Sequence, residues 1–268
     1  LPERVGEVTG GSIVYDGQEL LNLPEAEMLP LRGKRISMIF QDPMTSLNPT
    51  QTVGDQILEV LNLHFPEMTR DEKNKRVDEM MTLVGIPPQR KKSFPHEFSG
   101  GMKQRVVIAM ALVAEPELLL ADEPTTALDV TIQAQILELM KQLREKFNTS
   151  VMLITHDLGV VAQFCDSVSV VYAGRVVEYG PVEIVFQRKE NHPYTAGLFN
   201  CIPNLHDDQP RLHPIAGHMA DPRVEYKGCC FADRCEYATE RCRTEAPSMH
   251  VCGEHGILCH RYAEKEEF

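Results

Sequence analysis

Short apolar segments alternate with longer amphipathic ones over most of the chain. Runs of apolar residues bounded by polar turns predict buried strands, at residues 36–40, 118–121, 151–154 and 167–172. Apolar residues that recur every three or four positions predict helices, at residues 53–64, 71–84, 102–114 and around Ile132, Ile136, Leu139 and Leu143. Strands separated by helices predict an α/β fold, with a mostly parallel sheet covered on both faces.

The periodicity fades beyond Gly180, where proline, histidine and cysteine become frequent. A segment of this kind suggests a small domain held by something other than a large core. We therefore expect an α/β domain over residues 1–185 and a cysteine-rich C-terminal domain over residues 186–268.

Charge and hydropathy narrow the class of protein. The formal net charge is −12, which argues against nucleic acid as the main partner because phosphate binding requires a basic face. The longest strongly apolar run, residues 106–114, has nine residues, whereas a bilayer crossing needs roughly 20. The first residues lack the basic and apolar regions of a secretory signal. We expect a cytoplasmic protein docked on a membrane partner.

Two carboxylates, Asp122 and Glu123, end the strand at residues 118–121. Ligands of open α/β folds bind at the carboxyl ends of the strands. There one acid can hold Mg²⁺, and the other can polarise an attacking water. Alone, the pattern also suits a solvated acidic turn.

Ser99, Gly100 and Gly101 open a predicted helix. Free backbone N–H groups and the helix dipole at such a start favour a bound phosphate. An ordinary serine cap after a proline-rich loop is the plainer interpretation.

Five short motifs follow one another along the chain. They are Phe40-Gln41-Asp42-Pro43, Ser99-Gly-Gly-x-x-Gln104-Arg105, Asp122-Glu123-Pro124, Leu128-Asp129 and Thr155-His156-Asp157. In this order they resemble the Q-loop, signature, Walker B, D-loop and H-loop of the ABC ATPase family, over roughly residues 10–180. The resemblance implies a P-loop NTPase-like core, a helical signature subdomain, and ATP and Mg²⁺ as cofactors.

The resemblance also implies a role for each matching residue. Asp122 would bind Mg²⁺, Glu123 would be the catalytic base, and His156 would be the switch histidine at the γ-phosphate. Gln41 would reach toward magnesium and water and sense a membrane subunit. The implied nucleotide-binding residues, which act across a head-to-tail dimer, are Ser99, Gly100, Gly101, Gln104 and Asp129.

One element of the family pattern is missing from the 268 residues. No Gly-x-x-x-x-Gly-Lys-Ser/Thr loop occurs, although such a loop cradles the nucleotide phosphates. The opening Leu1-Pro2-Glu3 resembles the stretch shortly after that loop's helix. We therefore expect a chain truncated before or at this Walker A loop, and one that alone does not hydrolyse ATP at a normal rate.

Two further segments resemble the importers of oligopeptides, dipeptides and nickel. They are the long Q-loop at residues 40–49 and Asn191-His192-Pro193-Tyr194-Thr195. The resemblance implies peptide import, with nickel or another small solute as minority possibilities, on the cytoplasmic face of the membrane. The implied partners are a second ATPase subunit, two membrane permeases and, indirectly, an extracytoplasmic peptide-binding protein.

Six of the eight cysteines fall between Cys229 and Cys259. In a chain without a signal peptide such a cluster favours a metal or iron–sulfur site over disulfides. The surrounding residues resemble the C-terminal domain of peptide-importer ATPases, some of which carry a [4Fe–4S] cluster. The implied ligands are Cys229, Cys235, Cys242 and Cys259. Zinc and unliganded thiols stay open as alternatives.

A non-catalytic regulatory protein, which only completes a partner ATPase, is the alternative from another class. The missing loop favours it, whereas Glu123 and His156 argue against it. A chromosome-type ABC ATPase would need a long coiled-coil insertion, which the sequence lacks.

Overall fold

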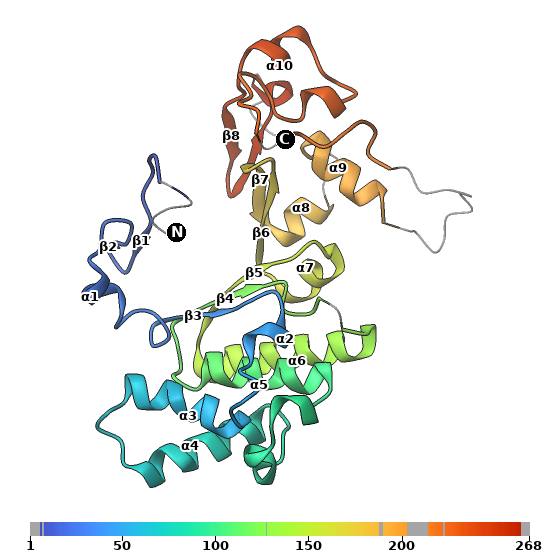
Figure 1. Ribbon diagram of the computed structural model, residues 1–268. Coiled ribbons are helices and arrows are strands. Elements are labelled where there is room, and N and C mark those ends of the chain that lie inside the picture. The colour runs from blue at the N-terminus through green and yellow to red at the C-terminus, as the bar shows by residue number, and fades with distance from the viewer. Residues whose placement is uncertain are drawn as a thin grey trace. The chain divides into compact units, whose positions relative to one another are not determined.

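The computed structural model describes residues 6, 8–126, 128–187, 190–202, 214–221 and 223–263. The opening residues Leu1, Pro2 and Glu3 lie outside this set. The chain divides into two compact units between His156 and Asp157, and Figure 1 labels their helices and strands. The sequence predicted a domain boundary between residues 185 and 186 instead, and that boundary stays a prediction.

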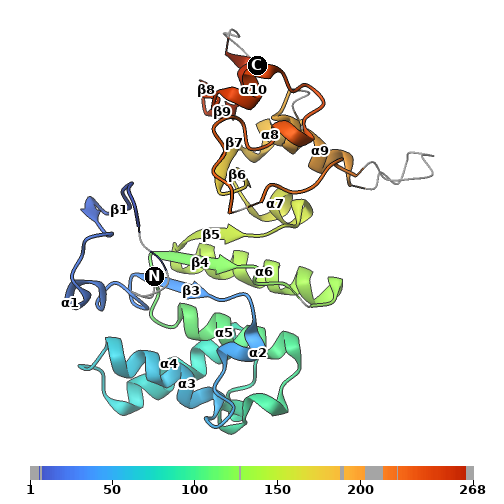
Figure 2. The ribbon, with the colours of Figure 1, turned by 45° about the horizontal axis from the view of Figure 1, so that its top comes forward.

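Three parallel strands form the centre of the first unit. They lie in the order β3 (Ile36–Ile39), β4 (Leu118–Asp122), β5 (Ser150–Ile154), and the predicted strands and their parallel direction are confirmed. Figure 2 shows them side by side. The register pairs Ile39 with Ala121 and Asp122 with Ile154, so the carboxyl ends of all three strands meet at one edge of the sheet.

Two helices of the first unit begin at threonine caps. Thr52 and Thr69 accept hydrogen bonds from amides of the first turns of α3 (Val53–His64) and α4 (Arg70–Leu83). Asn148, in the left-handed conformation at φ 51°, ends α6 (Val130–Phe147). The remaining elements are β1 (Val14–Tyr15), β2 (Gln18–Glu19), α1 (Glu25–Met28), α2 (Pro43–Ser46), η1 (Pro88–Lys92), η2 (Pro95–Glu97) and α5 (Gly100–Leu112).

One face of the parallel sheet carries the core of this unit. Side chains from α5, α6 and the strands are fully buried there, among them Ile39, Ile108, Leu119, Ile136 and Met140. On the strands of the other face Met38 is 38% exposed, Met152 57% and Ile154 48%. The prediction of a sheet covered on both faces is therefore wrong for the described residues. The apolar strands gave that prediction, because strands of parallel sheets are normally buried on both sides.

The second unit has a different sheet. Its strands lie in the order β6 (Ser167–Tyr172), β7 (Arg175–Pro181), β9 (His255–Leu258), β8 (Met249–Cys252), and all neighbours are antiparallel. The strand at residues 167–172 is confirmed, but it does not join the parallel sheet. Ala173 and Gly174, both at positive φ, close a tight turn, and a tight turn can join only antiparallel strands.

The other elements of the second unit are short. They are α7 (Leu158–Phe164), α8 (Val182–Gln187), α9 (Pro193–Asn200), η3 (Ala232–Arg234), α10 (Glu240–Thr244) and η4 (His260–Tyr262). Of all the helices in the described part of the chain, none has the length and apolar character that a bilayer crossing requires.

Candidate functional site

Three predicted site residues meet at the carboxyl edge of the parallel sheet. Gln41 follows β3, Glu123 follows β4, and His156 follows β5. Gln41 Nε2 donates to Glu123 Oε2 at 3.2 Å, and His156 Nδ1 lies 3.2 Å from Glu123 Oε1. The parallel register brings the ends of the strands together, and Glu123 stands at the middle of the group.

The backbone of Glu123 leaves β4 in an unusual conformation. Its φ is 44°, a left-handed value that residues with a side chain adopt rarely and that occurs in tight turns and at functional sites. Its N–H donates to Ile154 O at 2.9 Å, and its carbonyl accepts from Thr126 N at 3.1 Å. These two backbone bonds hold the turn in which the carboxylate is presented.

Thr126 is a site residue that the sequence reasoning missed. Its Oγ1 donates to Glu123 Oε2 at 2.7 Å. Hydrogen bonds from Thr126, then His156 and Gln41, hold the pKa of the Glu123 carboxyl below its usual range. Glu123 is therefore ionised at neutral pH and can orient water and stabilise positive charge. The signal in the sequence was a threonine three residues after the acid, where its hydroxyl can reach back across a turn.

Asp122 ends β4 itself and is partly buried. Among the described residues its carboxylate has no hydrogen-bond or ion-pair partner. A carboxylate of this kind at the carboxyl edge of a sheet suits a hard cation such as Mg²⁺.

The start of α5 is an open helix terminus. Ser99 occupies the N-cap position, but its side chain makes no capping hydrogen bond. Ser99 and Gly100 are exposed. The interpretation of Ser99 as an ordinary cap is therefore wrong, and its hydroxyl and the first amides of α5 are available to an anion.

Gln104 and Asp129 are both bound within the protein. Gln104 is fully buried, and its Nε2 donates to Pro124 O at 2.5 Å. Asp129 is exposed and caps α6 by accepting from Ile132 N at 2.9 Å. Their predicted contacts with nucleotide or with a second subunit stay predictions.

The tail motif at residues 191–195 lies inside the second unit. Asn191 Nδ2 donates to Glu178 Oε1 at 3.0 Å, and His192 N donates to Glu178 Oε2 at 2.9 Å. Burial lowers the pKa of His192 to about 4, so its ring is neutral. The motif joins α9 to β7 through a buried carboxylate.

The four cysteines implied as ligands line one cavity of about 20 Å³ in the second unit. These are Cys229, Cys235, Cys242 and Cys259. Burial raises the pKa of Cys229 to about 11 and raises those of Cys235 and Cys259. No three His, Cys, Asp or Glu side chains in the described part of the chain are arranged as a ready-made metal site. The four thiols thus converge without forming a closed ligand set.

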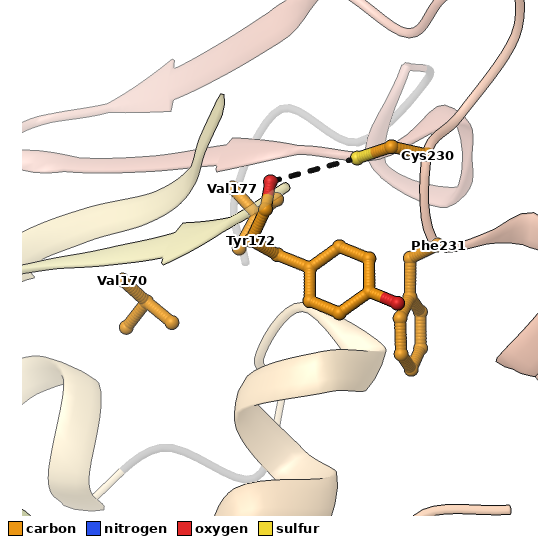
Figure 3. Close-up of a cluster of buried hydrophobic side chains, with 5 residues drawn as sticks. All are labelled: Val170, Tyr172, Val177, Cys230 and Phe231. Atoms are coloured by element: carbon orange, nitrogen blue, oxygen red, sulfur yellow. Dashed lines mark hydrogen bonds between the residues drawn. The ribbon is translucent and has the colours of Figure 1, made fainter. Parts of the chain in front are cut away.

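Cys230 belongs to a hydrophobic cluster instead, with Val170, Tyr172, Val177 and Phe231. Figure 3 shows its thiol directed to the carbonyl of Tyr172, with Sγ and O 3.8 Å apart. The rings of Tyr172 and Phe231 pack edge to face, with centroids 5.2 Å apart. Cys230 therefore has a packing role next to the four-cysteine cavity.

Gly228 allows the backbones at Cys229 and Cys242 to approach closely. A Cβ at Gly228 would overlap the carbonyl oxygen of Cys242 and lie 2.7 Å from the carbonyl carbon of Arg243. Cys229 N donates to Cys242 O at 2.8 Å in the same place.

We expect Gly228→Ala to destabilise the second unit by about 1–3 kcal/mol, because overpacking forces the backbone apart. Cys229 and Cys242 should then react faster with a thiol reagent than in the unsubstituted chain. Gly10→Ala is the control, since nothing lies within 4 Å of the added carbon. Unchanged labelling of both cysteines would contradict the prediction.

Comparison with known proteins places the chain among the ABC transporter proteins. Residues 4–126 match the family model for the ABC transporter, and residues 177–242 match that for the oligopeptide/dipeptide transporter C-terminal region. In solved structures, the chain resembles cbiO1 of Clostridium perfringens, part of an ABC transporter complex, with a TM-score of 0.61 and 30% identity over 69% of this chain and 71% of that one. It also resembles the dimeric ATP-binding cassette MJ0796 bound to ADP and Pi, with a TM-score of 0.59 and 29% identity over 65% and 74%.

Sequence relatives narrow the class further. The oligopeptide transport ATP-binding protein OppD of Haemophilus influenzae is 48% identical over 98% of this chain and 80% of its own length. The OppD of Salmonella typhimurium is 52% identical over 89% and 71%, and the dipeptide transport ATP-binding protein DppD of Bacillus subtilis 49% over 97% and 78%.

The fold is that of an ABC ATPase, a class whose members hydrolyse ATP. The chain belongs to the family of ATP-binding subunits of oligopeptide and dipeptide ABC transporters.

Proposed function

We propose that this chain energises the import of oligopeptides or dipeptides, with Glu123 as the residue that orients the attacking water. The observation that carries the proposal is the meeting of Gln41, Glu123 and His156 at the carboxyl edge of the sheet. Phosphoryl transfer to water depends mainly on positioning and electrostatic stabilisation, and these three side chains supply both.

The residues around Glu123 at the carboxyl edge of the parallel sheet are suited to bind MgATP. Bound MgATP supplies the phosphoryl group and a cation that neutralises its charge. Asp122 would hold Mg²⁺, His156 would contact the γ-phosphate, and Gln41 would orient water beside Glu123. The free carboxylate of Asp122 and the ionised state of Glu123 support this assignment.

The open start of α5 would serve a nucleotide held by a second ATPase subunit. Ser99, Gly100 and Gly101 offer a hydroxyl and helix N–H groups to a phosphate. The dimeric form of MJ0796 bound to ADP and Pi supports the pairing of two such subunits. Two membrane permeases and, indirectly, an extracytoplasmic peptide-binding protein would complete the transporter, with this chain on the cytoplasmic face.

The test of the function is peptide uptake by vesicles. They would contain the transporter assembled from this chain, its partner subunit and the permeases, with the binding protein outside. We expect ATP-dependent uptake of di- and oligopeptides, and none with Glu123→Gln. Uptake that persists in that variant would instead make the chain a non-catalytic component that completes its partner's site.

The 268 residues contain no Gly-x-x-x-x-Gly-Lys-Ser/Thr loop, the element that cradles the nucleotide phosphates in P-loop NTPases. We expect the 268-residue chain alone to show no ATPase activity above background. Activity of the pure chain that disappears in Glu123→Gln would refute this expectation.

We infer that the four cysteines around the cavity hold a [4Fe–4S] cluster. Four thiolates are the usual ligands of such a cluster, and their convergence on one cavity supports the set over any that includes Cys230. Anaerobically purified protein should be brown and contain iron and acid-labile sulfide, and Cys235→Ser should lose all three. Stoichiometric zinc without sulfide would replace the cluster with a zinc site.

A further inference from the structure

Gln104 is an unusual buried residue, because only one end of its amide is hydrogen-bonded. The side chain is 0% exposed, and Nε2 donates to Pro124 O at 2.5 Å. Its Oε1 is buried and has no hydrogen-bond partner among the described residues. A half-satisfied buried amide calls for an explanation, and the orientation of this one is fixed by the carbonyl of Pro124.

Pro124 directly follows Glu123 in the left-handed turn. The buried bond from Gln104 therefore anchors the peptide next to the carboxylate that Gln41, Thr126 and His156 surround. On its other side Gln104 belongs to α5, the helix that opens at Ser99.

The same face of α5 packs on the segment after Glu123 at two more places. Gly100, Gly101 and Gln104 share this face, since residues three and four apart are neighbours on a helix. A Cβ at Gly101 would lie 2.6 Å from Ile132 Cγ2, and one at Gly100 3.8 Å from Leu128 Cδ2. Ile132 is β-branched and stiff in a helix. The first turn of α5 thus has little freedom to move without the segment that begins at Pro124.

We propose that Gln104 is a positioning residue, which couples the first turn of α5 to the turn that presents Glu123. A phosphate that displaces or orders the start of α5 then alters the placement of Glu123 through the bond to Pro124. The inference rests on the proposed function, in which Ser99 and Glu123 serve two different nucleotides of one dimer. Gln104 would link those two sites within one chain, without touching either nucleotide.

Gln104→Met tests the link and keeps the length of the side chain. It removes the donor to Pro124 together with the unpartnered Oε1, so the two effects on stability partly cancel. Gln135→Met is the matched control, because Gln135 is exposed on α6 and, within the described part of the chain, accepts from Arg105 alone, at 3.3 Å.

The first measurement is amide hydrogen exchange in the chain itself. We expect the amide of Thr126, which bonds to Glu123 O, to exchange at least about tenfold faster in Gln104→Met. Exchange at Leu119, inside β4, should not change, whereas a general loss of stability would accelerate both. Equal protection of Thr126 in Gln104→Met and in the unsubstituted chain would overturn the proposal.

The second measurement is ATP hydrolysis by the assembled transporter. We expect Gln104→Met to lower kcat by roughly tenfold to a hundredfold, as small misplacements of catalytic groups do, with KM for ATP within about twofold. A raised KM with unchanged kcat would mean that Gln104 acts in nucleotide binding and would overturn the proposal. If the unsubstituted transporter hydrolyses no ATP, the proposed function is wrong. Amide exchange at Thr126 still shows whether Gln104 couples α5 to the turn at Glu123.

Discussion

Glu123→Gln is expected to lower kcat for ATP hydrolysis in the assembled transporter by about 10²–10⁴-fold, the usual contribution of a general base. ATP binding should be nearly unchanged, because the substitution keeps the size of the side chain and removes only its charge. Steady-state hydrolysis and equilibrium nucleotide binding on the same preparation measure the two effects. Glu138→Gln is the matched control, since Glu138 is exposed on α6 and has Gln142 as its one hydrogen-bond donor among the residues that the structure describes.

The surroundings of Glu123 predict a second effect of the same substitution. Gln41 Nε2 and Thr126 Oγ1 donate to one carboxylate oxygen, and His156 lies at the other. An amide has only one acceptor oxygen, so its NH₂ group would face one of these partners. If the amide oxygen keeps Gln41 and Thr126, His156 Nδ1 must become an acceptor, and the proton moves to Nε2. Two donors meet at Oε2 and one group lies at Oε1, so we expect the amide oxygen to stay with the two donors. Nitrogen NMR of His156 in Glu123→Gln should then show this tautomer, and an unchanged tautomer would show that the amide oxygen faces His156 instead.

The low pKa of Glu123 bears on how it acts. A strong general base has a pKa near the working pH, whereas the three hydrogen bonds hold that of Glu123 below its usual range. This environment favours a carboxylate that orients water and stabilises positive charge more than one that abstracts a proton early. In the loose transition state of phosphoryl transfer the bond to the attacking water is little formed. Orienting that water therefore matters more than removing its proton early.

The site positions that lie at the ends of the predicted strands could be predicted from the sequence. Apolar runs gave the three parallel strands and placed Glu123 at the end of one of them, whereas Gln41 and His156 came from the resemblance to the ABC ATPase family. Thr126 was missed because its bond to Glu123 depends on the left-handed turn at φ 44°, which no pattern of hydrophobicity encodes. The inward direction of Gln104 was missed too, since polar side chains in a signature motif suggest contact with ligand.

The C-terminal part was harder to predict, because its organisation depends on long-range pairing. The strand at residues 167–172 looks like a continuation of the parallel sheet, yet β7 pairs with β9 from the end of the chain. Glu178 lies on β7 and has the look of a solvent-facing residue between valine and tyrosine. Only the approach of His255 and the tail motif shows that it is buried.

Glu178→Ala is expected to destabilise the second unit by about 3–5 kcal/mol, the usual effect of removing one partner of a buried polar pair. Glu178 and His255 are both 0% exposed, with His255 Nε2 2.7 Å from Glu178 Oε1. The substitution also removes the acceptor of Asn191 Nδ2 and of His192 N. A buried donor without an acceptor destabilises the folded state by its full desolvation free energy. We therefore expect the tail motif to separate from β7.

Tyrosine fluorescence during denaturation measures this effect selectively. The protein has no tryptophan, and of its seven tyrosines only Tyr15 precedes residue 157, so the signal reports mainly on the second unit. Glu183→Ala, an exposed position on α8, should leave the transition within about 0.5 kcal/mol of its original place. A Glu178→Ala transition that coincides with this control would show that the buried carboxylate does not hold the unit together.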